Sequence, residues 1–450
     1  MRIMIVGAGM VGQHLSEKLS GEGQEVVLVD QDEKKLRRLE RELNILPIHG
    51  SGASARVLEE AGIDQTDLFI AVTDSDEVNL IACIISRQYN VKTRIARVRN
   101  EDFYAHGASR MEKTLGIDLV ISPDFAMAEE IMRLTTMSQA LEVAEFGNGQ
   151  VEMLGYLVRE GQPCVGSSLA DLKALQGVYD FVIVAIIRGE QTIIPRGQDR
   201  VEAGDKLYLV VRKQDVRAVE QLLFSSASHL PRQVFIIGGG TIGYLVARQL
   251  EKLNLNLRLV EQNPATCEIL SEQLDHAIVL NSDGLDAHDL LEEGIDQADL
   301  VIAVTSSDTT NILSSLLAKH HGAKKCITLL SNPAFIPMLG KLGIDVPLSP
   351  RQVAANLILR HVRGGGKIVN VVSLLGGDAE VIELKVPDRD QFVDLPLKHL
   401  SFPIGAVVGA IMRNGQALIP SGDTLLQPDD ILVIFFTKDA VAGVESLFDK

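Results

Sequence analysis

The chain has 450 residues, of which 46% are hydrophobic and 23% are charged; this composition is typical of a folded globular protein and excludes a disordered or fibrous one. Single hydrophobic cores stop growing at about 250–300 residues, so this length predicts several domains. The net charge of −17 disfavours binding to nucleic acid or to an anionic lipid surface. No apolar run is long enough to span a membrane, no signal peptide is expected, and the four widely spaced cysteines suggest neither a metal site nor a disulfide framework.

A glycine-rich turn lies between the first two predicted strands and consists of Gly7, Ala8, Gly9, Met10, Val11 and Gly12. Apolar residues 3–6 lead into this turn, a helical pattern follows it, and a second apolar run, 26–29, ends on Asp30. This order is the fingerprint of a dinucleotide-binding unit, in which the turn and the helix N-terminus hold phosphates and the acid binds ribose hydroxyls. We expect Gly7 to permit the tight turn, Gly9 to let the backbone approach a pyrophosphate, and Gly12 to let the helix pack on the strand. The alternative is a turn that serves only helix packing.

The same pattern returns 231 residues later in the chain. Residues 234–237 lead into a second glycine turn, and apolar residues 257–260 then end on Glu261. Residues 62–73 also recur almost unchanged as residues 294–305. Such an internal duplication predicts two copies of one two-part unit. The second turn consists of Gly238, Gly239, Gly240, Thr241, Ile242 and Gly243.

Each copy is predicted to begin with a Rossmann-like α/β domain, because short apolar strands alternate with helical stretches and this implies a parallel sheet covered on both faces. The second part of each copy is rich in β-type residues and predicts a small α+β domain. The strands of the first sheet are expected near residues 2–6, 25–29, 45–48, 68–72, 94–98 and 118–121. The four domains are expected at residues 1–123, 142–226, 232–349 and 367–450.

A helical stripe of apolar residues joins the two parts of copy one. Met127, Ile131 and Leu134 recur at helical spacing after Pro123. Two interpretations remain open: the helix packs on its own sheet, or it is exchanged or shared at a subunit interface.

Polar residues follow the carboxyl ends of the predicted strands, where open parallel sheets bind their ligands. Ser51 and Gly52 follow the third strand of copy one, and Thr73 and Asp74 follow the fourth. Thr73 and Asp74 either cap the next helix alone or cap it beside a bound adenosine. The corresponding candidates in copy two are Asp283 and Thr305.

Two arginines on the fifth strand, Arg97 and Arg99, are predicted to share one face of the sheet. A buried guanidinium group needs an anionic partner, which is either a phosphate or an acid such as Asp76 or Glu77. Copy two has Leu329 and Ser331 at the corresponding positions. We therefore expect the two sites to differ, with copy one favouring the more heavily charged phosphate chain.

The sequence offers no candidate for a catalytic centre. A nicotinamide-dependent oxidoreductase needs a general acid or base beside the nicotinamide, and the downstream modules contain no repeated residue that fits this role. A nucleotide-sensing transcriptional repressor would need a basic helix-turn-helix segment. Both functions are kept as alternatives, and a protein without enzymatic activity is expected.

These duplicated turns, together with residues 71–73, residues 95–99 and the two β-rich modules, resemble the TrkA family of tandem RCK (KTN) proteins over essentially the full length. In that family each RCK unit is a Rossmann-like domain followed by a small C-terminal domain. The resemblance implies a cytoplasmic regulatory subunit, peripheral to the inner face of the cell membrane, that gates a TrkH/TrkG-like potassium-translocating subunit. It also implies a homotetramer that binds NAD(H) and ATP/ADP and no nucleic acid.

Carried over by motif, the first site uses residues 7–11, Asp30, Thr73, Asp74 and Arg97. The second site uses residues 238–242, Glu261 and Thr305. The loss of both arginines leaves the phosphate contacts of the second site open. The ligand of the small domains, the nucleotide that activates and the ion selectivity of the complex also stay open.

Overall fold

The computed structural model describes residues 1–100, 114–137, 140–174, 179–189, 191–225, 230–332, 335–363, 368–373, 379–386, 395–400, 402–440 and 443–444. The chain forms two compact units. The first contains residues 1–129, 329–333 and 348–362, and the second contains residues 130–328, 334–347 and 363–450. In the part of the chain that the structure describes, no helix is long and apolar enough to cross a membrane.

The first unit is built on a six-stranded parallel sheet of order β3-β2-β1-β4-β5-β6. This is the strand order of a Rossmann fold. Successive strands are added on one side of β1 up to β3 and on its other side from β4 onward, and such sheets bind ligands at the switch point between β1 and β4. The predicted strands are confirmed to within about one residue at each end. Their observed bounds are β1 (Arg2–Val6), β2 (Glu25–Asp30), β3 (Leu46–His49), β4 (Leu68–Ala71), β5 (Thr93–Arg97) and β6 (Leu119–Ile121).

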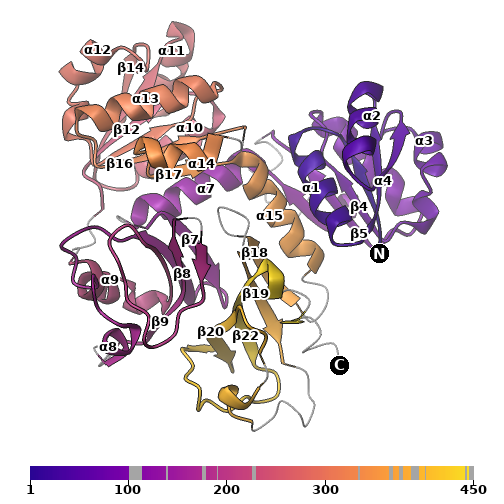
Figure 1. Cartoon of the computed structure of the whole chain (residues 1–450). Helices are drawn as coiled ribbons and strands as arrows, with labels where there is room; N and C mark the ends of the chain where they lie inside the picture. The colour runs from indigo at the N-terminus through magenta and orange to yellow at the C-terminus, as the bar shows by residue number, and fades with distance from the viewer. Residues whose placement is uncertain are drawn as a thin grey trace. The chain divides into compact units, whose positions relative to one another are not determined.

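Both faces of this sheet are buried, as expected of parallel strands that are apolar without alternation. Ile3 and Ile5 of β1 point into one cluster and Met4 and Val6 into another, because successive side chains of a strand point to opposite faces. Four helices of copy one cover the sheet (Figure 1): α1 (Met10–Gly21), α2 (Glu33–Glu42), α3 (Ala55–Glu60) and α4 (Asp76–Gln88).

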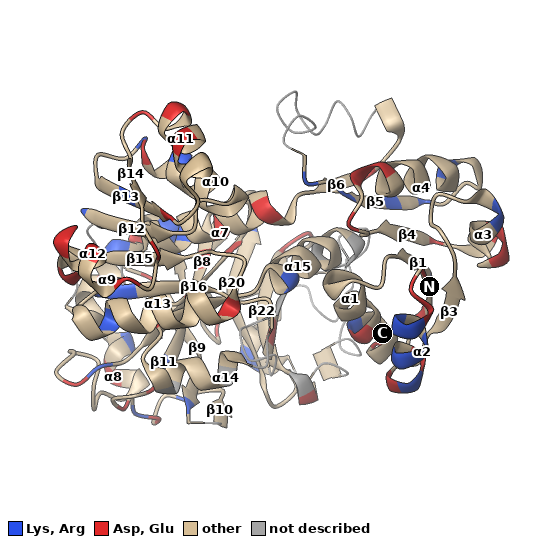
Figure 2. Ribbon diagram, turned by 90° about the horizontal axis from the view of Figure 1, so that it is seen from above, with Lys and Arg blue, Asp and Glu red and all other residues tan. Residues whose placement is uncertain are grey.

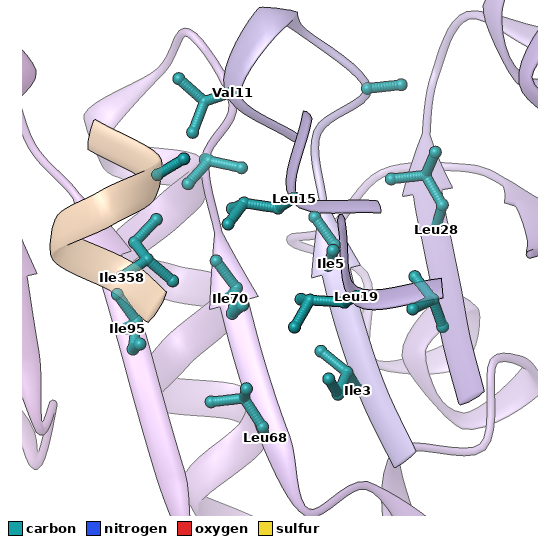
Figure 3. Close-up of a cluster of buried hydrophobic side chains, with 14 of the residues drawn as sticks. Ile3, Ile5, Val11, Leu15, Leu19, Leu28, Leu68, Ile70, Ile95 and Ile358 are labelled. Carbon is teal, nitrogen blue, oxygen red and sulfur yellow. The ribbon is translucent and has the colours of Figure 1, made fainter. Parts of the chain in front are cut away.

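A helix from copy two completes the core of the first unit. In α15 (Pro350–Arg363), four buried residues belong to the same apolar cluster as Ile5 and Leu15. Figure 3 shows Ile358 beside Ile95 and Ile70 of the first sheet. The helix is therefore exchanged between the two copies within this chain. The four residues are Ala354, Ala355, Ile358 and Leu359.

The corresponding helix of copy one, α7 (Pro123–Thr136), enters the second unit from Glu130 onward. Lys325 lies at the start of β16 in the sheet of copy two. Its ammonium donates to the carbonyl group of Leu134 in the last turn of α7 and to those of Met137 and Ala140, which follow the helix. The distances from Nζ to the carbonyl oxygens of Leu134, Met137 and Ala140 are 2.8, 3.0 and 2.9 Å. Of the two interpretations left open for α7, packing on its own sheet is wrong for this half of the helix. Exchange at a subunit interface stays a prediction.

The second unit repeats the Rossmann-like sheet in the order β14-β13-β12-β15-β16-β17. The two sheets have the same strand order because the two copies share their apolar strands and their glycine turns. The strands are β12 (Gln233–Ile237), β13 (Asn256–Glu261), β14 (Ile278–Asn281), β15 (Leu300–Ala303), β16 (Lys325–Leu329) and β17 (Val346–Leu348). The helices are α10 (Thr241–Leu250), α11 (Pro264–Gln273), α12 (Ala287–Glu292), α13 (Asp308–His321) and α14 (Ile336–Leu339).

Each small module contains a five-stranded sheet, and the order β10-β9-β11-β8-β7 of the first matches the order β21-β20-β22-β19-β18 of the second. One apolar cluster joins the two modules, with Phe146 and Met153 on one side and Met412 and Phe435 on the other. The first module comprises β7 (Glu142–Phe146), β8 (Val151–Leu157), α8 (Leu169–Ala174), β9 (Phe181–Arg188), β10 (Gln191–Ile193), β11 (Lys206–Arg212) and α9 (Val216–Phe224). The second comprises β18 (Ile368–Ser373), β19 (Ala379–Lys385), β20 (Ala406–Arg413), β21 (Gln416–Leu418) and β22 (Ile431–Thr437).

Candidate functional site

The first glycine turn is held between the ends of three strands. Gly7 has a φ of +109°, and its N–H donates to the carbonyl of Val29 at 2.8 Å. A Cβ atom on Gly7 would lie 2.8 Å from the backbone nitrogen of Thr73. A Cβ on Gly12 would lie 1.8 Å from the carbonyl oxygen of Gly7, so this position requires glycine for packing alone. The second turn repeats this geometry, with a φ of +110° at Gly238 and its own close approach to Thr305.

Gly9 differs from these packing glycines because a Cβ there would meet no atom within 4 Å. Gly9 is also the N-cap of α1, and no side chain caps this helix. No side chain therefore caps the first N–H groups of α1, and the uncapped N-terminus of a helix can bind a phosphate. Gly240 has the same open surroundings and is the N-cap of α10, which also has no side-chain cap.

The acid at the end of the second strand holds the glycine turn in place. The N–H of Ala8 donates to Oδ2 of Asp30 at 2.5 Å, and the N–H of Asp32 donates to Oδ1 at 2.7 Å. In copy two, Glu261 accepts from Gly239 and Asn263, each at 2.8 Å. A carboxylate has about four acceptor positions, so these two bonds leave capacity for ribose hydroxyls. The acid thus has a structural role that the sequence did not reveal.

The most important residue that sequence reasoning missed is Asn79, which is fully buried in α4. Its Oδ1 accepts from the N–H and the hydroxyl of Thr73 at 2.8 and 2.7 Å. Its Nδ2 donates to the carbonyls of Thr73 at 3.0 Å and Arg97 at 2.9 Å, so one side chain joins the ends of β4 and β5. Asn311 holds Thr305 in the same way in copy two. The repetition of this Asn six residues after each Thr was the available signal.

Arg97 and the loop after β4 face the same space. The Arg97 side chain is only 9% exposed, and its Nη1 lies 3.3 Å from Oδ1 of Asp74. Its Nε is buried and has no hydrogen-bond partner among the described residues. Burial lowers the pKa of Arg97, as does the nearby charge of Arg99, whereas Asp74 acts in the opposite direction. The guanidinium is therefore incompletely satisfied and retains a donor for an anion.

The acids expected to pair with these arginines need a correction. Asp76 accepts the backbone N–H of Arg99 at 2.9 Å, while Glu77 accepts the hydroxyl of Ser75 at 2.7 Å, a bond that lowers the pKa of Glu77. Among the described residues neither carboxylate binds a guanidinium, because both are occupied at the start of α4. Asp74 takes this place instead, at 3.3 Å from Arg97 and 3.7 Å from Arg99.

The residues after the third strands mainly shape their own turns. A Cβ on Gly52 would lie 2.1 Å from Cγ1 of Val6, so glycine is needed for packing. The hydroxyl of Ser51 accepts from the N–H of Ala53 at 3.3 Å, and Asp283 accepts from the N–H of Leu285 at 2.9 Å. The structure therefore brings together the turn, the acid and the threonine of each copy, while the described bonds of Ser51 and Asp283 stay within their own turns.

The two copies also differ in the charge beside the acid. Helix α2, which follows Asp30, carries five exposed basic residues, whereas α11, which follows Glu261, carries none (Figure 2). Leu329, in the place of Arg97, is buried at 8% exposure. The five basic residues are Lys34, Lys35, Arg37, Arg38 and Arg41. In the residues that the structure describes, no group of three potential ligand side chains could hold a metal ion.

Comparison with known proteins places this architecture in a family. The TrkA-N domain family matches residues 3–123 and 234–350, and the TrkA-C domain family matches residues 153–223 and 381–449. The chain belongs to the TrkA family. It is 35% identical to Trk system potassium uptake protein TrkA homolog 1 of Methanosarcina mazei, with both chains fully covered. It is 36% identical to the Trk system potassium uptake protein TrkA of Halomonas elongata over the whole chain and 98% of that relative. The resemblance inferred from the duplicated motifs is confirmed.

Solved structures agree with this TrkA architecture at the level of the fold. The crystal structure of the GsuK RCK domain is similar with a TM-score of 0.63 and 21% identity. The match covers the whole of the present chain and 95% of the GsuK chain. The GsuK channel bound to NAD is similar over the whole chain and 78% of that chain, also with a TM-score of 0.63 and 21% identity. The predicted fold, two Rossmann-like domains each followed by a small α+β domain, is confirmed.

Proposed function

We propose that this protein is the regulatory subunit of a Trk-type potassium uptake system and that its two Rossmann-like domains sense nucleotides. The observation that carries the proposal is the pair of open helix N-termini at Gly9 and Gly240, each beside an acid that holds the turn. Its relatives are named as potassium uptake proteins, which supports a regulatory rather than an enzymatic role.

The ligands that fit these sites are NAD(H) and the adenine nucleotides ATP and ADP. The phosphates would lie at the N-terminus of α1 or α10, and Asp30 or Glu261 would accept the ribose hydroxyls. Structures of the similar GsuK channel contain NAD in one case and ADP in another, which supports both ligand classes. Arg97 gives the first site a cation for the end of a longer phosphate chain, and the buried Leu329 gives the second site none.

The partner in this proposal is a membrane-embedded potassium-translocating subunit of the TrkH/TrkG kind. The regulatory subunit would act as a homotetramer on the cytoplasmic face of the membrane, where it meets the cellular nucleotide pool. A ligand shifts the equilibrium between two arrangements of such an assembly only if it binds one of them more tightly than the other. A coupling free energy of about 1–3 kcal/mol changes the equilibrium constant about 5- to 150-fold. ATP and ADP, which differ by one phosphate at Arg97, would bias the pore in opposite directions.

Potassium flux through the reconstituted complex tests this function with two matched variants, Gly9→Ser and Gly240→Ser. Serine is a preferred N-cap, and a Cβ atom would meet no atom within 4 Å at either position. We therefore expect the fold to be retained and the hydroxyl to compete with the phosphate. We expect Gly9→Ser to abolish the response of flux to ATP, and Gly240→Ser to leave an ATP response through the first site. Wild-type flux that responds to no nucleotide would contradict the proposal.

A further inference from the structure

The first small module contains a buried carboxylate that the nucleotide sites do not explain. Glu152 lies on β8, an inner strand between β11 and β7, and its side chain is 0% exposed. Neither of its carboxylate oxygens has a hydrogen-bond partner among the described residues. An ionised carboxylate in such a place is strongly unfavourable, whereas a protonated one is far less so.

The groups around Glu152 do not balance its charge. Glu145 lies directly across from it on β7, and like charges at such a pair repel. The ammonium of Lys213 lies 2.9 Å from Glu145 but 3.6 Å from Glu152, beyond hydrogen-bond distance, and its side chain is 56% exposed. From α9, the buried Glu220 faces the same region and accepts the hydroxyl of Tyr156 at 2.8 Å. The cation of Lys213 is thus shared between Glu145 and Glu152 and lies closer to Glu145.

The remaining charged groups at this end of the module are paired elsewhere. Arg212 lies 2.7 Å from Asp215 and 3.5 Å from Asp180. The buried Lys325 binds the carbonyl groups of Leu134, Met137 and Ala140. Asp345 and Glu220 both favour the charged form of Lys325. None of these groups supplies the missing positive charge to Glu152, so a proton is the simplest way to neutralise it.

We propose that Glu152 is a proton-binding site that holds a proton in the folded protein, and that loss of this proton weakens the packing of α9 on β8. The site lies outside both glycine turns. It goes beyond nucleotide sensing, because it makes the first small module respond to pH. Ionisation places a negative charge beside Glu145 and Glu220, which the exposed Lys213 offsets only in part.

The direction of the pH effect follows from burial. Burial raises the pKa of Glu152 to about 7, helped by Glu145 and Glu220 and opposed by Lys213. The folded state therefore holds a proton that the unfolded state has released above its own pKa of about 4.3. The stability that this proton contributes is present at low pH and is lost as the pH rises toward 7.

Infrared difference spectroscopy of the full chain between pH 5.5 and 8 detects this proton through the carbonyl band of a protonated carboxylic acid. We expect the band in the wild type to disappear with a midpoint near pH 7, and to be absent in Glu152→Gln. The matched control is Glu380→Gln, at the corresponding position of β19, where the residue across the strand is Ser373 and Glu380 is only half-buried. This variant should keep the band, and a band that survives unchanged in Glu152→Gln would overturn the proposal.

Two further variants keep the test decisive if Glu152→Gln fails to fold. Lys213→Met removes the opposing charge and should move the midpoint to higher pH, whereas Glu145→Gln removes a like charge and should move it lower. A midpoint that moves in neither variant would refute the assignment. The thermal midpoint of the wild type should also fall more steeply with pH than that of Glu145→Gln between pH 5.5 and 7, and equal slopes would exclude a weakening of α9 packing by ionisation.

Discussion

Replacing Arg97 with methionine separates phosphate recognition from folding. Methionine keeps most of the volume of the buried stem and removes the guanidinium. The lost ion pair joins Arg97 to Asp74, which is 86% exposed, and pairs with such exposed partners contribute only about 0–1 kcal/mol. The free energy of unfolding should therefore change little. A hydrogen bond to a charged group contributes about 1.5–3 kcal/mol, so loss of the phosphate contact should weaken ATP binding roughly 10- to 150-fold.

Isothermal titration calorimetry of the full chain with ATP and with NAD measures this effect. ATP binding at the first site should weaken in Arg97→Met, and NAD binding should change less, because NAD lacks the terminal phosphate. The matched control is Leu329→Met in copy two, which replaces one apolar side chain by another and should leave ATP binding at the first site unchanged. Wild-type ATP affinity in Arg97→Met, together with two indistinguishable sites, would refute the reasoning.

Two further predictions concern stability and are measured by chemical denaturation. Asn79→Ala leaves buried polar groups at the ends of β4 and β5 without partners, and each such group costs about 1–3 kcal/mol. The substitution should therefore lower the free energy of unfolding by about 2–5 kcal/mol. A change below about 0.5 kcal/mol would show that this side chain does not join the strands. Ile358→Ala should lower the free energy of unfolding by about 2–5 kcal/mol, because α15 is part of the hydrophobic core of the first unit. Met338→Ala, at a 57% exposed position, should lower it by less than about 0.5 kcal/mol. Equal effects of the two substitutions would contradict the exchanged helix.

The sheets and turns could be predicted from the sequence because their signals are local. Apolar runs of four or five residues bounded by glycine and acid define parallel strands, and the duplication tests each assignment twice. Strand β7 has a weaker signal, since the acids Glu142 and Glu145 interrupt its apolar pattern. The four domain boundaries remain predictions.

The partners of individual side chains could not be predicted in the same way. An apolar stripe shows that a helix is buried but not which sheet buries it, so the exchange of α7 and α15 needed the structure. The sequence indicated that Arg97 requires an anion, yet the choice of Asp74 over Asp76 depends on which carboxylate the start of α4 already occupies. The burial of Glu152 left no trace in the sequence, where it is one acid in the β-rich second part of copy one.

Potassium flux through the complex of this protein with its membrane subunit, measured in proteoliposomes with ATP or ADP on the side that carries the protein, tests the central claim most directly. We expect the two nucleotides to shift flux in opposite directions, with the difference removed by Gly9→Ser. The same flux in ATP, in ADP and without nucleotide would contradict the account.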